Sequence, residues 1–171
     1  MPRPTLTITA PRTAADLRIG RTIWGWLLRH VNVRAEFTFD GSHVRVSFPF
    51  SNARDLGIGL DASTAWSVEA MRYRPLPSIY NAGVVYKREP VCRTAGRVHI
   101  CEEWLTAHES YARGWGDCDD LGPWRAAELR TQGELAQAIP RRSPVGWHIV
   151  VRRGDGTIED PSARLGMPTA S

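Results

Sequence analysis

Lysine is almost missing from this chain of 171 residues, since Lys87 is the only one and every other basic side chain is arginine. No apolar run approaches the ~20 residues that a membrane-spanning helix needs. No small-residue cleavage site follows the apolar residues 23–28. We therefore expect no membrane span, no signal peptide and a cytoplasmic protein. The sequence also lacks internal repeats, and its length suits one domain with its own core.

Cysteine is scarce as well, with Cys92, Cys101 and Cys118 only. A small odd number argues against a disulfide framework and leaves room for one functional thiol among packing residues. The net charge is +4, but the arginines are scattered among acidic residues. Because no basic stripe with interleaved aromatic residues is present, we do not expect a nucleic-acid partner.

The first 75 residues are predicted to form an N-terminal extension to a core of residues 76–171. Residues 1–20 show little periodicity, and we expect a partly mobile arm there. Alternating apolar residues over 31–50 predict a β-hairpin that turns at Asp40-Gly41 and sets Phe37 opposite Val44. The remaining expected elements are a helix over 62–73 capped by Asp61, helices over 98–112 and 118–130, and strands over 147–152 and 157–160.

Cys118 is the candidate nucleophile, because it follows a glycine-containing turn and stands at a predicted helix start. A helix N-terminus favours the thiolate, and a tight turn presents backbone N–H groups that can stabilise an oxyanion. Asp117, Asp119 and Asp120 surround it. Their negative charge opposes a thiolate unless they point away, cap the helix or bind arginine.

Among five histidines, His148 stands out because an ionisable residue is unexpected on an apolar strand. Asp160 ends the next predicted strand and can orient the imidazole of His148. Side chains alternate along strands, so the two residues share a face only if the loop between the strands has an odd number of residues. With a three-residue loop at 154–156, Asp160 lies opposite Val150 and diagonal to His148. The hypothesis therefore predicts an odd loop.

Three segments in this order resemble the transglutaminase-like branch of the papain-like cysteine enzymes: residues 116–120, 147–151 and 159–162. The sequence is most similar to small stand-alone versions encoded in phage and prophage regions. Residues 86–90 and 164–167 add to the likeness, which spans roughly residues 78–167. The resemblance implies an α+β papain-like core, in which a helix carrying cysteine packs on an antiparallel sheet carrying histidine and aspartate.

The resemblance also implies acyl transfer on amide bonds by Cys118, His148 and Asp160, without a metal or organic cofactor. We expect a peptide or protein substrate. Hydrolysis of a peptide or isopeptide bond is the reaction we expect first, and transamidation is the alternative. Trp115 is the nearest oxyanion-hole candidate by position, because family members often place a Trp, Tyr or Gln side chain there. Trp147 beside His148 is a candidate for shielding the site from water.

Other interpretations stay open. The chain could be a phage-type structural or assembly protein that keeps the fold without turnover and docks other subunits through its hairpin. A peptidoglycan amidase commonly has a second histidine as its third residue, so Asp160 counts against that class. Considered without the other two residues, Cys118 could be a buried packing residue. Asp160-Pro161 could likewise be a simple turn. A metal site would need His99, Cys101, His108 and Cys118, which lack CxxC or HxxxH pairing.

Overall fold

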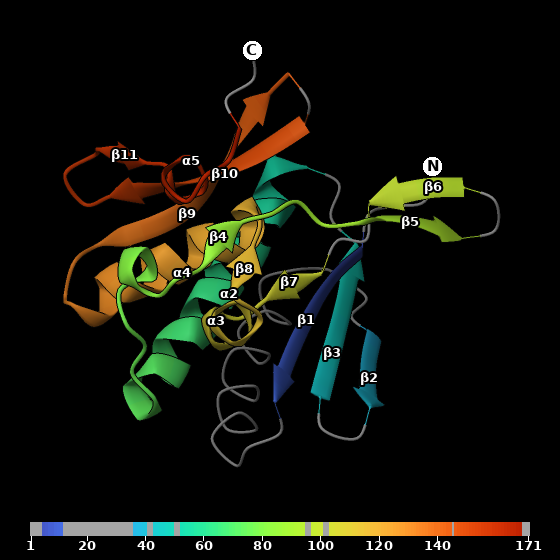
Figure 1. The fold of residues 1–171 in the computed structure, drawn as a ribbon, viewed down its shortest axis with the longest axis horizontal. Coiled ribbons are helices and arrows are strands. Elements are labelled where there is room, and N and C mark those ends of the chain that lie inside the picture. Colours follow the sequence, from blue (N-terminus) through green and yellow to red (C-terminus); the bar gives the residue numbers. More distant parts are fainter. Residues whose placement is uncertain are drawn as a thin grey trace.

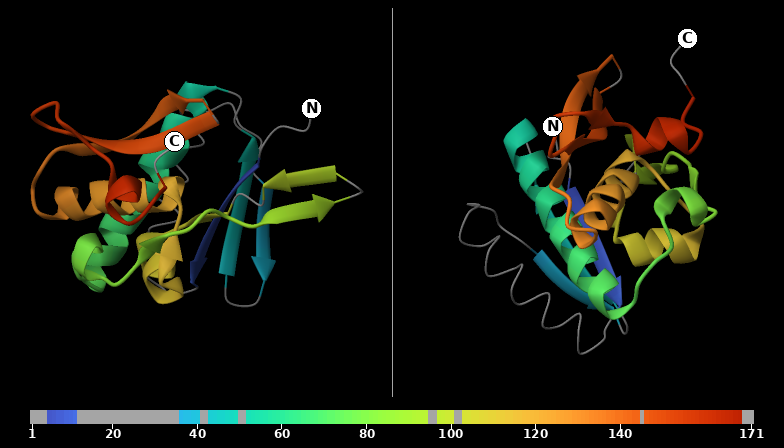
Figure 2. Two further views of the ribbon diagram at one scale, coloured as in Figure 1. Left: turned by 45° about the horizontal axis from the view of Figure 1, so that its top comes forward. Right: turned by 90° about the vertical axis from the view of Figure 1, so that its left-hand side faces the viewer.

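The computed structural model describes residues 5–11, 36–40, 43–49, 52–94, 97–100, 103–144 and 146–168. These residues form an α+β structure, which confirms the predicted class. Two larger sheets lie on either side of a long helix (Figures 1 and 2). The helices are α2 (Ala53–Tyr73), α3 (Ala107–Arg113), α4 (Cys118–Thr131), α5 (Pro161–Arg164) and the short 3₁₀ helix η1 (Ile79–Asn81).

The first sheet has the strand order β2-β3-β1-β7. Its strands are β1 (Thr5–Pro11), β2 (Glu36–Asp40), β3 (His43–Pro49) and β7 (Trp104–Leu105). The expectation of a mobile N-terminal arm is wrong for residues 5–11, because β1 pairs with both β3 and β7.

The register predicted for the hairpin is also wrong, since Phe37 lies opposite Val46 rather than Val44. A shift by two residues leaves the same side chains on each face, so the apolar pattern alone does not determine it. Residues 31–35, 41–42 and 50 of the predicted hairpin lie outside the described residues.

Helix α2 begins at Ala53, nine residues before the predicted start at 62. Asn52 is its N-cap, and its side chain accepts hydrogen bonds from two backbone N–H groups of the first turn. Asp61 is therefore no cap. It lies inside the helix and pairs with Arg130 at 3.3 Å. Gly57 and Gly59 lower the stability of the helix, but packing of Leu56 and Leu60 in the core outweighs that loss.

The helix predicted over 98–112 is wrong, because the chain forms two strands before a shorter helix. Strands β5 (Val91–Thr94) and β6 (Arg97–Ile100) make a hairpin that projects beyond the first sheet (Figure 1). After β7, a capping box between Thr106 and Glu109 begins α3. Helical and strand periodicities are hard to separate in such short apolar runs.

The second sheet has the order β11-β10-β9 and is antiparallel. Its strands are β9 (Ala136–Ser143), β10 (Gly146–Arg153) and β11 (Ile158–Glu159). Strand β9 lies between the predicted helix over 118–130 and the predicted strand over 147–152, where no strand is expected from the sequence. It lies at a sheet edge, where a proline such as Pro140 is tolerated.

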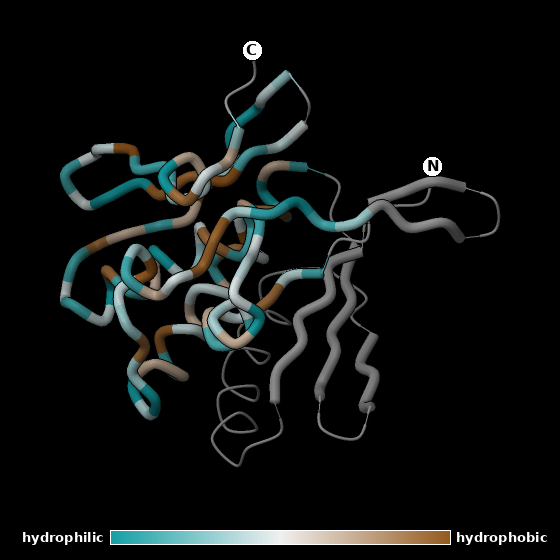
Figure 3. The backbone as a smooth tube through the Cα atoms, viewed as in Figure 1, coloured by the Kyte–Doolittle hydropathy of each residue, from teal (hydrophilic) through white to brown (hydrophobic). Residues whose placement is uncertain are grey.

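Helix α4 lies at the centre of the core, and its residues from 119 to 129 are buried except Arg125. One side packs with α2, β9 and β10 in an apolar cluster that includes Leu60, Leu129 and Ile149. Another side packs with α3, η1 and the end of α2 around Trp124. Figure 3 shows hydrophobic segments inside this part of the chain. Residues 53–73 therefore belong to the same packed unit as the C-terminal sheet.

Two short strands, β4 (Val85–Tyr86) and β8 (Trp115–Gly116), pair in parallel next to the start of α4. The backbone N–H of Lys87 donates to the carbonyl of Gly116 at 2.9 Å. The N–H of Tyr86 donates at 2.9 Å to the carbonyl of Leu165, just beyond α5. Strand β4 thus lies between the segment that leads into α4 and the segment that follows α5.

Candidate active site

Cys118 is the first residue of helix α4, and its neighbours form a double cap. The carboxylate of Asp117, the N-cap residue, accepts a hydrogen bond from the backbone N–H of Asp119 at 3.3 Å. Asp120, at the third helical position, accepts one from the N–H of Asp117, also at 3.3 Å. This capping box begins the helix at Cys118. The thiol therefore lies where the helix dipole favours a negative charge.

Asp120 also ties the start of α4 to the first sheet. Its second carboxylate oxygen accepts a hydrogen bond from the Leu105 N–H at 2.6 Å, and the residue is only 1% exposed. A Cβ at Gly116 would lie 2.9 Å from the Cβ of Asp120, too close for any residue but glycine. The spacing of glycine and aspartates around Cys118 thus has a local structural reason.

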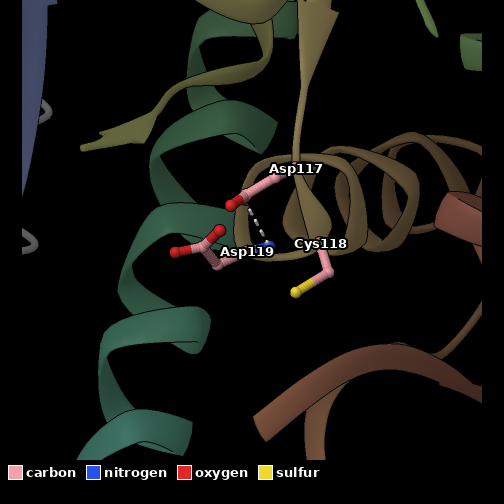
Figure 4. Close-up of side chains that lie close together, drawn as sticks. All are labelled: Asp117, Cys118 and Asp119. Atoms are coloured by element: carbon pink, nitrogen blue, oxygen red, sulfur yellow. Dashed lines mark hydrogen bonds between the residues drawn. The ribbon is translucent and has the colours of Figure 1, made fainter. Parts of the chain in front are cut away.

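The third acidic neighbour, Asp119, is buried, and its carboxyl group lies beside that of Asp117 (Figure 4). Burial raises the pKa of Asp119 well above its ordinary value, and the carboxylate of Asp117 raises it further. Burial also raises the pKa of Asp120, with Asp117 adding to the effect. A raised pKa keeps these carboxyl groups protonated to higher pH. They therefore place less negative charge beside the thiol than their number suggests.

One ligand atom from each of Asp117, Cys118 and Asp119 lies within 4.8 Å of the other two, so by distance these side chains could hold a cation. The donor set does not match one metal class, because a soft thiolate and hard carboxylates select different ions. One oxygen of Asp117 is also engaged by the helix cap. We therefore interpret the cluster as a helix cap around a thiol.

The side chains of His148 and Asp160 are in contact, with 2.8 Å between the histidine Nε2 and the aspartate Oδ2. Arg152 pairs with Ile158, and Arg153 donates to the carbonyl of Thr157, which leaves a three-residue loop between β10 and β11. The predicted odd loop is confirmed. His148 and Asp160 are about one-fifth and one-third exposed, so the pair remains open to solvent.

The contact with Asp160 uses Nε2 and leaves Nδ1 as the nitrogen of His148 that can exchange a proton with a thiol. A carboxylate only accepts hydrogen bonds, so Nε2 carries the proton and donates to it. In the neutral ring Nδ1 then holds the lone pair of a base. The contact therefore selects the tautomer that a Cys–His pair needs.

Asp160 is held from two sides. Its second oxygen, Oδ1, accepts a hydrogen bond from the Ala163 N–H at 2.9 Å and caps helix α5, with Pro161 at the first helical position. The turn interpretation and the catalytic interpretation of Asp160-Pro161 are therefore compatible. The helix cap stabilises the carboxylate in the position from which it contacts His148.

Glu159, next to Asp160, lies at the centre of an ion-pair network that joins four elements. Arg125 of α4 contacts it at 2.8 Å, and Arg153 of β10 at 3.6 Å. The hydroxyl of Tyr80 on η1 also donates to it. Arg125 has a second partner in α4, Glu128, at 3.1 Å. This network fixes the end of β11, and with it Asp160, against the helix that begins at Cys118.

Glu159→Gln is expected to lower the free energy of unfolding by about 2 kcal/mol at neutral pH, because it breaks a largely buried ion pair. Burial acts to raise the pKa of Glu159, but hydrogen bonds from Arg125 and Tyr80 outweigh it, so the pKa lies below the ordinary 4.5. Because the folded-state pKa is lowered, the Glu159 carboxylate stabilises the protein fully above its unfolded-state pKa near 4.5, and this contribution is lost as the pH falls through the folded-state pKa.

Urea unfolding at neutral and acidic pH measures this difference, which should shrink in acid. The control is Glu134→Gln, which removes the outer partner of Arg153 where both side chains are about one-third exposed. We expect a much smaller effect there. An equal effect of the two substitutions, or a difference that grows in acid, would contradict the role of Glu159.

Helix α4 approaches strand β10 at a glycine. A Cβ at Gly122 would lie only 2.7 Å from Cγ2 of Ile149, the residue after His148. Gly122 is one helical turn beyond Cys118. Cys118 and Trp147 pack against the same apolar cluster, so helix α4 and strand β10 meet closely on the face that carries Trp147 and Ile149.

Both tryptophans named from the sequence have cations over their rings. The Arg113 guanidinium lies 3.6 Å and the Lys87 ammonium 4.8 Å from the ring centroid of Trp115. The Arg142 guanidinium lies 4.0 Å from that of Trp147. Trp147 is half-buried and packs against the apolar cluster that also contacts Cys118, and its shielding role stays a prediction.

Tyr86 is a residue near the thiol that received no role in the sequence analysis. Burial raises its pKa, the nearby Arg88 guanidinium acts in the opposite direction, and a thiolate at Cys118 raises it again. Its hydroxyl therefore stays protonated and within electrostatic reach of Cys118. The likeness of residues 86–90 to the family was the signal that could have identified it.

Comparison with protein families, with curated proteins and with solved structures gives no match. Among the described residues, none of the helices has both the length and the apolar character to cross a membrane.

Proposed function

We propose that this chain is a cysteine-dependent acyl-transfer enzyme of the transglutaminase-like kind, with a papain-like core. The observation that carries the proposal is the contact between His148 and Asp160 on the sheet against which helix α4, beginning with Cys118, is packed. The chain order of cysteine, histidine and aspartate matches the resemblance found in the sequence. A helix on an antiparallel sheet also fits the papain-like arrangement.

In the proposed reaction, Nδ1 of His148 takes the proton of the Cys118 thiol, and the thiolate attacks an amide carbonyl carbon. The carbonyl oxygen becomes an oxyanion, which backbone N–H groups at the start of α4 and the hydroxyl of Tyr86 can stabilise. The C–N bond then breaks. The imidazolium returns its proton to the leaving amine, and a thioester remains on Cys118.

The thioester is released when a second nucleophile attacks it. His148 removes a proton from water, or from an amine, and the thiolate leaves as the new bond forms. Water gives hydrolysis, and an amine gives transamidation. We propose hydrolysis of a peptide or isopeptide bond as the main outcome, and added hydroxylamine would trap the thioester in either case.

The pH dependence of Cys118 alkylation by iodoacetamide tests the Cys–His pair directly. An ordinary thiol is under about 1% ionised at about pH 6 and labels slowly there. We expect rapid labelling of Cys118 at that pH, and loss of this acidic limb of the profile in His148→Ala. Mass spectrometry of the Cys118 peptide separates its labelling from that of Cys92 and Cys101.

His108→Ala is the matched control, because His108 lies on α3 and contacts the carbonyl of Arg74 rather than the site. Its labelling profile should follow that of the native protein. Slow labelling that follows an ordinary thiol in both native protein and His148→Ala would overturn the proposal. The non-catalytic structural interpretation would then be the better one.

A further inference from the structure

We infer that the substrate carries carboxylate side chains next to the scissile amide, so that the substrate class is an acidic peptide. This inference rests on the proposed function for its scissile bond. It is carried by a set of cationic residues around the site, which we call the cationic rim. Its members are Lys87, Arg88, Arg113, Arg141 and Arg142.

One half of the rim lies at the segment that leads into Cys118. The backbone N–H of Lys87 is bonded to Gly116, and the Lys87 side chain lies over Trp115 beside that of Arg113. Arg88 lies near Tyr86 and acts to lower the pKa of its phenol, which a thiolate at Cys118 acts to raise. These cations therefore lie along β4 and β8, the strands next to the start of α4.

The other half lies at the histidine. Arg141 is the cross-strand partner of His148, and Arg142 is that of Trp147. Directly opposed residues on antiparallel strands have Cβ atoms about 5 Å apart. Because side chains alternate along these strands, an anion next to the imidazole would meet Arg141, while Arg142 lies over Trp147 on the other face.

The charges of the rim are largely available to a ligand. Lys87, Arg88, Arg141 and Arg142 are exposed, and none forms an ion pair with a carboxylate among the residues that the structure describes. Only Arg113 has an acidic partner there, Glu103 at 3.7 Å. Of the acidic residues beside the rim, Asp117 caps α4, Asp119 is buried with a raised pKa, and Glu89 is buried and accepts a hydrogen bond from the Glu103 N–H.

The geometry favours carboxylates over nucleic acid. Arginine stacked on an aromatic ring uses its flat face and keeps its N–H edge for a two-pronged bond to a carboxylate. Binding of single-stranded nucleic acid instead relies on aromatic faces on which bases stack. The faces of Trp115 and Trp147 already have cations over them.

Equilibrium binding to Cys118→Ala, which cannot form a thioester, tests the rim separately from catalysis. The probes are fluorescent peptides with blocked ends that differ only by Glu or Gln on both sides of one amide, measured by anisotropy. Hydrogen bonds to charged groups predict about tenfold tighter binding of the Glu peptide at low salt, about 50 mM. The preference should weaken at about 300 mM salt.

Arg88→Gln and Arg142→Gln, each placed in Cys118→Ala, should weaken binding of the Glu peptide by about threefold to tenfold and leave the Gln peptide unchanged. Arg72→Gln is the control, since Arg72 is an exposed arginine of α2 that pairs with Glu69. A Gln peptide with an unblocked C-terminus shows whether a terminal carboxylate suffices. If only this peptide with a free C-terminus binds more tightly, the inference that the substrate carries carboxylate side chains is overturned.

Equal affinity for the Glu and Gln peptides, or no saturable binding of the Glu peptide, would overturn the inference. Tighter binding of a single-stranded oligonucleotide would also overturn it. Turnover by the native protein gives the separate answer on function. Cleavage of both peptides at equal rates would support the proposed enzyme activity and reject recognition of carboxylates by the cationic rim. Selective binding of the Glu peptide without any acyl transfer would support that recognition and reject the enzyme activity.

Discussion

Asp160→Ala is expected to slow the alkylation of Cys118 at about pH 6 by about 100-fold, because the imidazole loses the group that holds its tautomer and orientation. The substitution also removes the cap of helix α5, so stability and function would change together. Two further variants separate these effects. Asparagine keeps the helix cap through its Oδ1 but turns an NH2 donor toward Nε2, which cannot accept the imidazole proton, while serine can cap a helix but is too short to reach His148.

We therefore expect both Asp160→Asn and Asp160→Ser to label slowly while unfolding at nearly the native denaturant concentration. Labelling rates by mass spectrometry and urea unfolding measure the two properties. If Asp160→Ser labels like the native protein, the aspartate serves only as a helix cap. Its proposed part in catalysis would then be rejected.

Gly122→Ala is expected to lower the free energy of unfolding by about 1–3 kcal/mol, since the new methyl group would lie 2.7 Å from Ile149 Cγ2. Relief of the clash would push helix α4 away from β10 and move Cys118 relative to His148. We therefore also expect slower labelling of Cys118 at about pH 6. Denaturant unfolding and labelling rates measure the two effects.

Gly57→Ala is the matched control in another helix, because nothing lies within 4 Å of a Cβ built there. It should stabilise the protein by about 0.5–1 kcal/mol. Adding Ile149→Ala to Gly122→Ala should give a smaller loss than the sum of the single losses, because the clash is then absent. Strict additivity would argue against close packing of α4 on β10.

The sequence alone predicted the parts of the site that depend on neighbouring residues. Alternating apolar residues around His148, and glycines at the turn, predicted two strands and an odd loop, and the register of β10 and β11 confirms that loop. The contact between His148 and Asp160 follows from this local geometry. The helix at Cys118 was also predicted, because capping residues act within one turn.

Elements with a weak pattern of apolar residues could be identified only from the tertiary structure. Strand β9 reads as a polar linker because it carries arginines and Pro140, and only its pairing with β10 makes it a strand. The glycines near residue 57 read as a helix break, yet packing against the core continues α2 through them. Burial and pairing far along the chain outweigh local propensity in both places.

The same distinction holds within the site. The sequence determined that a cysteine stands at a helix start, that acidic residues surround it, and that a histidine and an aspartate can share one face. Only the tertiary structure decided that Glu159 is held by Arg125 and that Tyr86 lies near the thiol. It also placed arginines opposite His148 and Trp147. These contacts join residues distant along the chain, and single-sequence periodicity carries no signal for such pairs.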